Sequence, residues 1–86
     1  MKTIFHLVGA HGSGKSTLAE MIGKSYEARG KKCAGIFDPM SEFIKDREHA
    51  IKHWPDADVI FIEHLPEEAF NTAKGDKIIR LLTVEN

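Results

Sequence analysis

Net charge, cysteine and long apolar runs are all scarce in this 86-residue chain. Twelve Lys and Arg residues nearly balance thirteen Asp and Glu residues, and the formal net charge of −1 excludes a global attraction to nucleic acids or anionic membranes. The single cysteine, Cys33, cannot form an internal disulfide, and its apolar surroundings favour a buried structural thiol. No apolar run approaches the length that spans a bilayer. We therefore expect a cytoplasmic protein with neither membrane nor nucleic acid as a partner, which holds any anionic ligand through a local site.

The length is that of one small domain, residues 1–86. Short apolar runs predict four strands, over residues 3–8, 32–37, 58–63 and 77–84. The helical spacing of apolar residues predicts helices over 15–29 and 40–54. Pro66 followed by two glutamates predicts a short third helix that closes at Gly75.

Strands and helices that alternate in this way predict an α/β fold. We expect a three-layer sandwich with a four-stranded parallel sheet of order 2-3-1-4, and Phe43 and Trp54 in its core. Ligands of such folds bind at the carboxyl ends of the strands. The segment 9–16, Asp38 and Glu63 each follow a strand at that edge, so three features of the sequence converge on one place.

The segment 9–16 reads GAHGSGKS and matches the pattern G-x-x-x-x-G-K-[ST] between a strand and a helix. Backbone N–H groups of such a loop point inward as an anion nest, and the helix that begins near Gly14 adds the positive end of its dipole. Lys15 is placed to reach the β and γ phosphates, and the Ser16 hydroxyl to ligate Mg²⁺. His11 stands at a variable position, where it either contacts the nucleotide or faces water. The residues expected to bind the phosphates are Gly9, Ala10, His11, Gly12, Ser13, Gly14, Lys15, Ser16 and Thr17.

The stretch GAHGSGKST resembles the complete Walker A motif of the P-loop NTPases, and DVIFIEH is similar to their Walker B strand. The resemblance implies binding of ATP or another nucleoside triphosphate, with Mg²⁺ held by Ser16 and Glu63. Aspartate is the usual residue at the end of the Walker B strand, where this chain has Glu63. Glu63 therefore either reaches the metal or its water shell, polarises an attacking water, or merely ends a strand at the surface. The chain contains no N-K-x-D type segment for reading guanine, which favours ATP over GTP.

The first two-thirds of the chain resemble the nucleoside and small-metabolite kinases of this superfamily, such as the adenylylsulfate kinases. In those enzymes a carboxylate after the second strand lies near the acceptor, which implies that role for Asp38. Asp38 before Pro39 is equally well placed as a helix N-cap. A similar pattern occurs in the nucleotide-binding adaptor and partitioning ATPases.

Three functions stay open on this basis. The chain is a nucleotide-binding domain with weak or partner-dependent hydrolysis, a kinase for a small acceptor, or a non-catalytic regulatory or adaptor module gated by nucleotide. Lys15, Glu63 and Asp38 are the expected catalytic residues of the first two.

Arginine occurs only at positions 29, 47 and 80. The kinases that the chain resembles close over the phosphates with a lid that carries arginines. Arg47, which shares the predicted second helix with Lys45 and Lys52, is the best internal candidate for this role, and a solvated helix face is the favoured alternative for it. A second subunit or a protein partner is the other possible source of an arginine. His49 and His53 on that helix have a spacing compatible with metal coordination, but no third ligand accompanies them in sequence, which favours a solvated or partly packed pair.

Overall fold

A computed structural model describes residues 2–82 of the chain. Within these residues it contains four strands, two α-helices and one 3₁₀ helix. In chain order they are β1 (Thr3–Val8), α1 (Lys15–Glu27), β2 (Cys33–Ala34), η1 (Pro39–Glu42), α2 (Arg47–His53), β3 (Val59–His64) and β4 (Lys77–Arg80). None of these helices is both long and apolar enough to cross a membrane.

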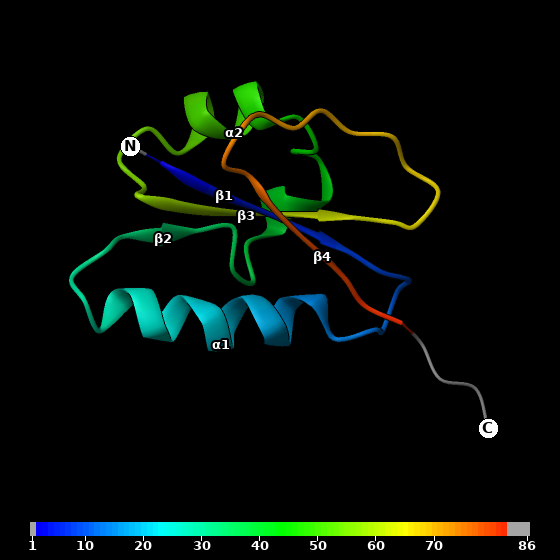
Figure 1. The fold of residues 1–86 in the computed structure, drawn as a ribbon, viewed down its shortest axis with the longest axis horizontal. Coiled ribbons are helices and arrows are strands. Elements are labelled where there is room, and N and C mark those ends of the chain that lie inside the picture. The colour runs from blue at the N-terminus through cyan, green and yellow to red at the C-terminus, as the bar shows by residue number, and fades with distance from the viewer. Residues whose placement is uncertain (1, 83–86) are drawn as a thin grey trace.

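The four strands form one parallel sheet in the order β2-β3-β1-β4, as the sequence predicts. Helix α1 covers one face of the sheet, while α2 lies over the other (Figure 1). The three-layer α/β sandwich is therefore confirmed. The carboxyl ends of β1 and β3 lie together, because Val8 pairs with His64 in register.

The central strands β1 and β3 are buried on both faces, which explains their nearly continuous apolar sequences. Phe5, Leu7, Ala19, Val59 and Phe61 form the core under α1. Ile4, Ile44, Ala50, Ala57, Ile60 and Ile62 form the core under α2. Successive residues of β3 thus alternate between the two faces of the sheet.

The predicted strand over 32–37 is wrong in length, since β2 comprises only two residues. Gly35 adopts a φ of 83°, and a Cβ atom there would collide with the backbone oxygen of Phe61. The chain therefore leaves the sheet at a point that only glycine allows. Phe37 follows with a positive φ of 50°, which is uncommon for a residue other than glycine.

The predicted helix over 40–54 is divided into η1 and α2. Asp46 has extended backbone dihedrals, and its carboxylate accepts a hydrogen bond from His49 N at 3.2 Å, so it starts a new helix as an N-cap. The break turns Phe43 outward, where it is 70% exposed, and the expectation of a core position is wrong. Trp54 does pack against the core on this face.

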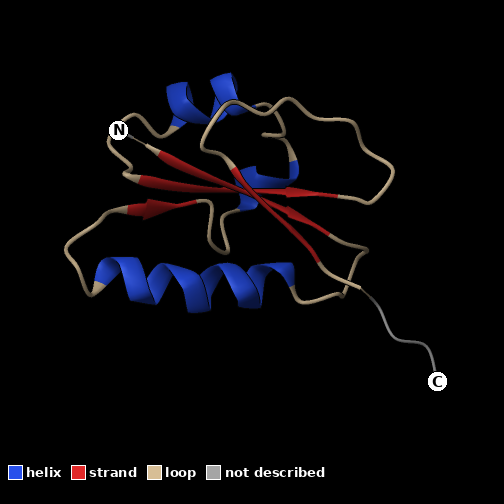
Figure 2. Cartoon of the chain, viewed as in Figure 1, coloured by secondary structure: helices blue, strands red, loops and turns tan. Residues whose placement is uncertain are grey.

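No helix forms in 66–75; the segment between β3 and β4 consists of turns and loop (Figure 2). The Glu68 carboxylate accepts from Leu65 N at 2.6 Å, and the Asp76 carboxylate accepts from Ala73 N at 3.0 Å. These local bonds close turns in place of a continuous helix. The fourth strand ends at Arg80, and positions 83 and 84 of its predicted range lie outside the described residues.

Candidate functional site

The loop between β1 and α1 is shaped by its glycines. Gly12 and Gly14 adopt left-handed φ values of 76° and 92°. Gly9 lies against the Ser13 side chain, so that a Cβ atom at position 9 would collide with Ser13 Oγ. That hydroxyl is buried and has no hydrogen-bond partner among residues 2–82. The loop therefore leaves a buried polar atom beside a backbone that must stay free of side chains.

The loop also presents free backbone donors. Gly14 is the N-cap of α1 but contributes no side-chain cap, and Lys15 and Ser16 form the first turn. In the part of the chain that the structure describes, the N–H groups of Gly12, Gly14, Lys15 and Ser16 have no backbone or side-chain acceptor. These donors and the positive end of the α1 dipole make a cradle for an anion.

Lys15 directs its ammonium to the carboxyl end of the sheet. Its side chain is almost fully buried, and Nζ donates to the carbonyl oxygen of Gly9 and, at 3.3 Å, to that of His64. No carboxylate within residues 2–82 forms an ion pair with it. An ammonium has three donors, so one remains for a ligand.

Ser16 and Glu63 meet at the same edge. The Ser16 hydroxyl donates to Glu63 Oε2 at 3.0 Å, across from α1 to β3. Glu63 is half-buried and lies on the α1 face of β3. The structure thus brings together the two residues that the sequence predicts as Mg²⁺ ligands, and their oxygens are the ligand type that Mg²⁺ prefers.

A cleft of about 950 Å³ opens beside the loop; it is lined by residues 11–17 of the loop and the start of α1, and by Phe37, Asp38, Pro39, Ser41 and Glu42 after β2. Asp38 lines it, but its Oδ1 accepts from Met40 N at 2.9 Å and caps η1. Both interpretations of Asp38 are therefore compatible with its position. Phe37 lines the cleft beside it and is 61% exposed.

Arg47 does not line this cleft, so it is not the internal cation, and its contacts are not those of a solvated helix face either. Its guanidinium binds Asp76 through Nε at 3.0 Å and Nη2 at 3.2 Å. Lys45, which precedes the N-cap of α2, lines the cleft instead and donates from Nζ to the Glu63 carbonyl at 2.6 Å. Lys52 is exposed on α2 and lies outside the lining of the cleft.

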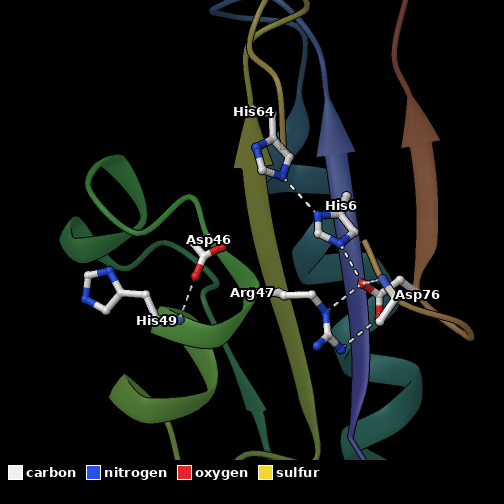
Figure 3. Close-up of polar contacts among 7 residues, drawn as sticks. His6, Asp46, Arg47, His49, His64 and Asp76 are labelled. Atoms are coloured by element: carbon white, nitrogen blue, oxygen red, sulfur yellow. Dashed lines mark hydrogen bonds and ion pairs between the residues drawn. The ribbon is translucent and has the colours of Figure 1, made fainter. Parts of the chain in front are cut away.

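A buried polar network, which sequence reasoning missed, lies on the α2 face of the sheet, opposite to the face that carries Glu63 (Figure 3). Asp76 joins the Arg47 guanidinium to His6 Nε2, which is 2.9 Å from Asp76 Oδ2, and His6 Nδ1 lies 3.0 Å from His64 Nε2. Phe70 stacks on both imidazoles, with ring centroids 4.9 Å from His6 and 3.9 Å from His64. The network anchors the segment between β3 and β4 to β1, β3 and α2.

His64 belongs to both the network and the candidate site. Its carbonyl accepts from Gly9 N at 3.0 Å and from Lys15, while its imidazole is fully buried and leaves Nδ1 without a partner within residues 2–82. Burial lowers the pKa of His64 to about 4, and electrostatic contributions from His6 and Lys45 act in the same direction. The imidazole is therefore neutral at pH 7.

Stability should fall as the pH drops below 6.5. Unfolded His64 takes up a proton near its ordinary pKa of 6.5, whereas the folded protein resists protonation down to about 4. The unfolded state binds more protons in this window, and the free energy of unfolding should decrease by up to about 3 kcal/mol between these two values. Urea denaturation at several pH values would measure the slope.

His64→Gln should flatten that slope, because glutamine does not titrate. His49→Gln is the matched control, since His49 is exposed on α2, and it should keep the wild-type slope. An unchanged slope in His64→Gln would assign the acid sensitivity to other groups.

The other predicted positions have structural roles or face solvent. His11 is exposed at the edge of the cleft. His49 and His53 are exposed, and His53 meets the Trp54 ring edge-on at 5.0 Å. Cys33 is free, and burial raises the pKa of its thiol. Within the described residues, no group of three or more His, Cys, Asp or Glu side chains is arranged to hold a metal ion.

No family model, curated protein or solved structure matches the chain.

Proposed function

We propose that this protein binds the Mg²⁺ complex of a nucleoside triphosphate, with ATP favoured, at the carboxyl edge of its sheet. The observation that carries the proposal is the contact between Ser16 and Glu63 beside a glycine loop in which several N–H groups have no acceptor within residues 2–82. It joins a phosphate cradle and a pair of oxygen ligands at one point. The resemblance to P-loop NTPases favours the same ligand.

The charge of the cleft supports a magnesium complex over a bare triphosphate. Four carboxylates line the cleft, at Asp38, Glu42, Glu63 and Glu68, and Lys15 and Lys45 are the only lysines among its lining residues. A bare polyphosphate would meet a net negative wall. A divalent cation held by Ser16 and Glu63 would offset this repulsion by neutralising part of the negative charge.

The residues divide the binding between them. The free N–H groups of Gly12, Gly14, Lys15 and Ser16 hydrogen-bond phosphate oxygens, and the remaining donor of Lys15 contacts the β and γ phosphates. Ser16 and Glu63 are the residues that would hold Mg²⁺, which supplies charge neutralisation when bound. In hydrolysis, a water oxygen bonds to the terminal phosphorus and the bond to the bridging oxygen breaks, releasing phosphate and the diphosphate.

We assign the orientation of the water to Glu63, the carboxylate that contacts Ser16 beside the loop. We expect hydrolysis to be weak unless further positive charge reaches the terminal phosphate, because phosphoryl transfer depends on stabilising that charge. The ligand and the single free Cys33 fit a cytoplasmic setting. A second subunit or a protein partner that covers the cleft would raise the rate.

Removing Mg²⁺ should weaken ATP binding by at least about ten-fold, because the acidic cleft then repels the triphosphate. Isothermal titration calorimetry with ATP, in Mg²⁺ and in EDTA, measures the difference. Glu63→Gln should reduce the Mg²⁺ dependence, since it removes the carboxylate opposite the phosphates.

Glu67→Gln is the matched control, because Glu67 is exposed and lies outside the cleft lining. It should bind like the wild type. Equal affinity for ATP with and without Mg²⁺ would contradict the role of the metal in binding. If calorimetry detects no binding of any nucleoside triphosphate, the proposed function as a whole is wrong.

A further inference from the structure

The terminal phosphate needs a second cation, and Lys45 is the side chain that the fold puts in place for it. This inference rests on the proposed function and assigns one more residue of the same site. The Arg47 guanidinium is bound to Asp76 in the polar network, whereas Lys45 lines the cleft.

Lys45 and Lys15 converge on consecutive peptide groups. Lys45 Nζ donates to the carbonyl of Glu63, and Lys15 Nζ donates to that of His64. Both ammonium groups therefore lie at the carboxyl end of β3, on the cleft that the phosphate loop borders. Lys15 approaches from α1 and Lys45 from the segment between η1 and α2, and both residues line the cleft.

Lys45 keeps donors and charge to spare. Its ammonium makes one hydrogen bond, to a neutral carbonyl, and forms no ion pair with a carboxylate in the part of the chain that the structure describes. Two N–H donors remain for another acceptor. A half-buried cation without a carboxylate partner favours an anionic ligand, since a charge-assisted bond would offset its lost hydration.

The backbone on both sides of Lys45 is anchored. Ile44 is almost fully buried in the core under α2, and Asp46 caps that helix. Residue 45 is thus held between a core contact and a helix start, and its side chain alone adjusts. A long lysine stem can swing from the Glu63 carbonyl to a phosphate oxygen without a change in the fold.

We infer that Lys45 binds the terminal phosphate of the nucleotide and serves as the second cation of the site. The side chain exchanges its bond to the Glu63 carbonyl for one to a γ-phosphate oxygen. Lys15, by contrast, is placed for both the β and γ phosphates. Lys45 therefore distinguishes a triphosphate from a diphosphate, and it places in this chain part of the charge that hydrolysis requires.

Calorimetry with ATP and ADP, each with Mg²⁺, tests the assignment on the full chain. Lys45→Ala should weaken ATP binding about ten-fold to a hundred-fold, the value of a hydrogen bond to a charged group, and change ADP binding by less than about three-fold. Lys45→Arg should restore most of the preference for ATP. Lys52→Ala removes an exposed lysine outside the cleft and should match the wild type.

A measurement on the wild-type chain covers the case in which Lys45→Ala fails to fold. Acetylation of lysines with a soluble reagent, read by mass spectrometry, should slow at Lys45 with ATP and Mg²⁺ but not with ADP and Mg²⁺. Lys52 should react equally in both.

The outcomes separate the two proposals. Wild-type binding of ATP together with equal affinities in Lys45→Ala, or equal losses for ATP and ADP, would overturn the role of Lys45 alone. Equal acetylation of Lys45 with both nucleotides would do the same. Failure of the wild type to bind any nucleotide would instead overturn the proposed function.

Discussion

Replacing Lys15 by alanine should weaken ATP binding by at least about a hundred-fold, because the phosphates lose their nearest buried cation. Lys15 as a residue is 9% exposed, and its ammonium donates to the carbonyls of Gly9 and His64, so it is already oriented before the ligand arrives. Binding energy is therefore not spent on ordering this side chain. Calorimetry with ATP and Mg²⁺ measures the loss.

The same substitution should leave the fold intact. Burying an ammonium without a carboxylate partner costs free energy, and removing it relieves that cost. We expect a thermal midpoint for Lys15→Ala equal to that of the wild type or higher. Lys15→Met, which keeps most of the apolar stem, should lose binding to the same extent.

Lys24→Ala is the matched control, since Lys24 is exposed on the same helix and its one ion pair within residues 2–82 is with Glu20. It should bind ATP like the wild type. If Lys15→Ala binds as tightly as the wild type, the phosphate loop is not the ligand site. If Lys15→Ala binds weakly only because it unfolds, the interpretation of Lys15 as a ligand-binding residue that is oriented before the ligand arrives is wrong.

Replacing Asp76 by alanine should lower the free energy of unfolding by about 3 to 5 kcal/mol, the cost of breaking a buried ion pair from one side. The Asp76 side chain is 4% exposed and accepts from Arg47, His6 and Ala73. Burial alone would raise the pKa of Asp76, but these hydrogen bonds outweigh it and hold that pKa below its ordinary value. Without the carboxylate, the Arg47 guanidinium stays half-buried and unpaired.

Urea denaturation measures this effect, and Asp56→Ala, at an exposed turn, should change stability by less than about 0.5 kcal/mol. A domain of this length has a total stability on the order of 5 to 10 kcal/mol, so Asp76→Ala should approach the limit of folding. The double variant Arg47→Met with Asp76→Leu should recover part of the loss, since it removes both charges. A loss for Asp76→Ala no larger than that for Asp56→Ala would contradict a structural role for the network.

The parallel sheet and the position of the glycine loop, residues 9–16, could be predicted because both depend on local signals. The strand 3–8, the glycines after it and the spacing of apolar residues in α1 are each visible within about one element. The parallel direction of the strands then follows from the alternation of strands and helices. Ser16 and Glu63 meet because the carboxyl ends of β1 and β3 share an edge.

The polar network could not be predicted because its partners are far apart in sequence. His6 and Asp76 are separated by seventy positions, and no local pattern connects them. The one available signal is that His6 and His64 each interrupt or end an apolar strand, on the same face of the sheet. Phe70 and the capped turns hold the segment 65–76 to that face, which is why a helix signal such as Pro66 did not prevail.

The assignment of the internal cation failed for a related reason. A single continuous helix would have placed Lys45 and Arg47 in one series, whereas Asp46 ends one segment and begins the next. The side chains on either side of that cap then contact different parts of the fold. Lys45 binds the Glu63 carbonyl beside the cleft, and Arg47 binds Asp76 in the polar network. Predicting this required the boundary of α2 to within one residue, which sequence patterns do not provide.

The alternation along β3 has a consequence for how the protein can be assembled. Glu63 projects toward Ser16, and the next residue, His64, projects into the network, so two unrelated environments are separated by one peptide unit. A slip of the β1–β3 pairing by a single position would place an imidazole beside the phosphate loop and a carboxylate beside His6. Both environments would be lost together. Nucleotide binding at this edge would therefore report that β1 and β3 are paired in the register that sets Val8 against His64.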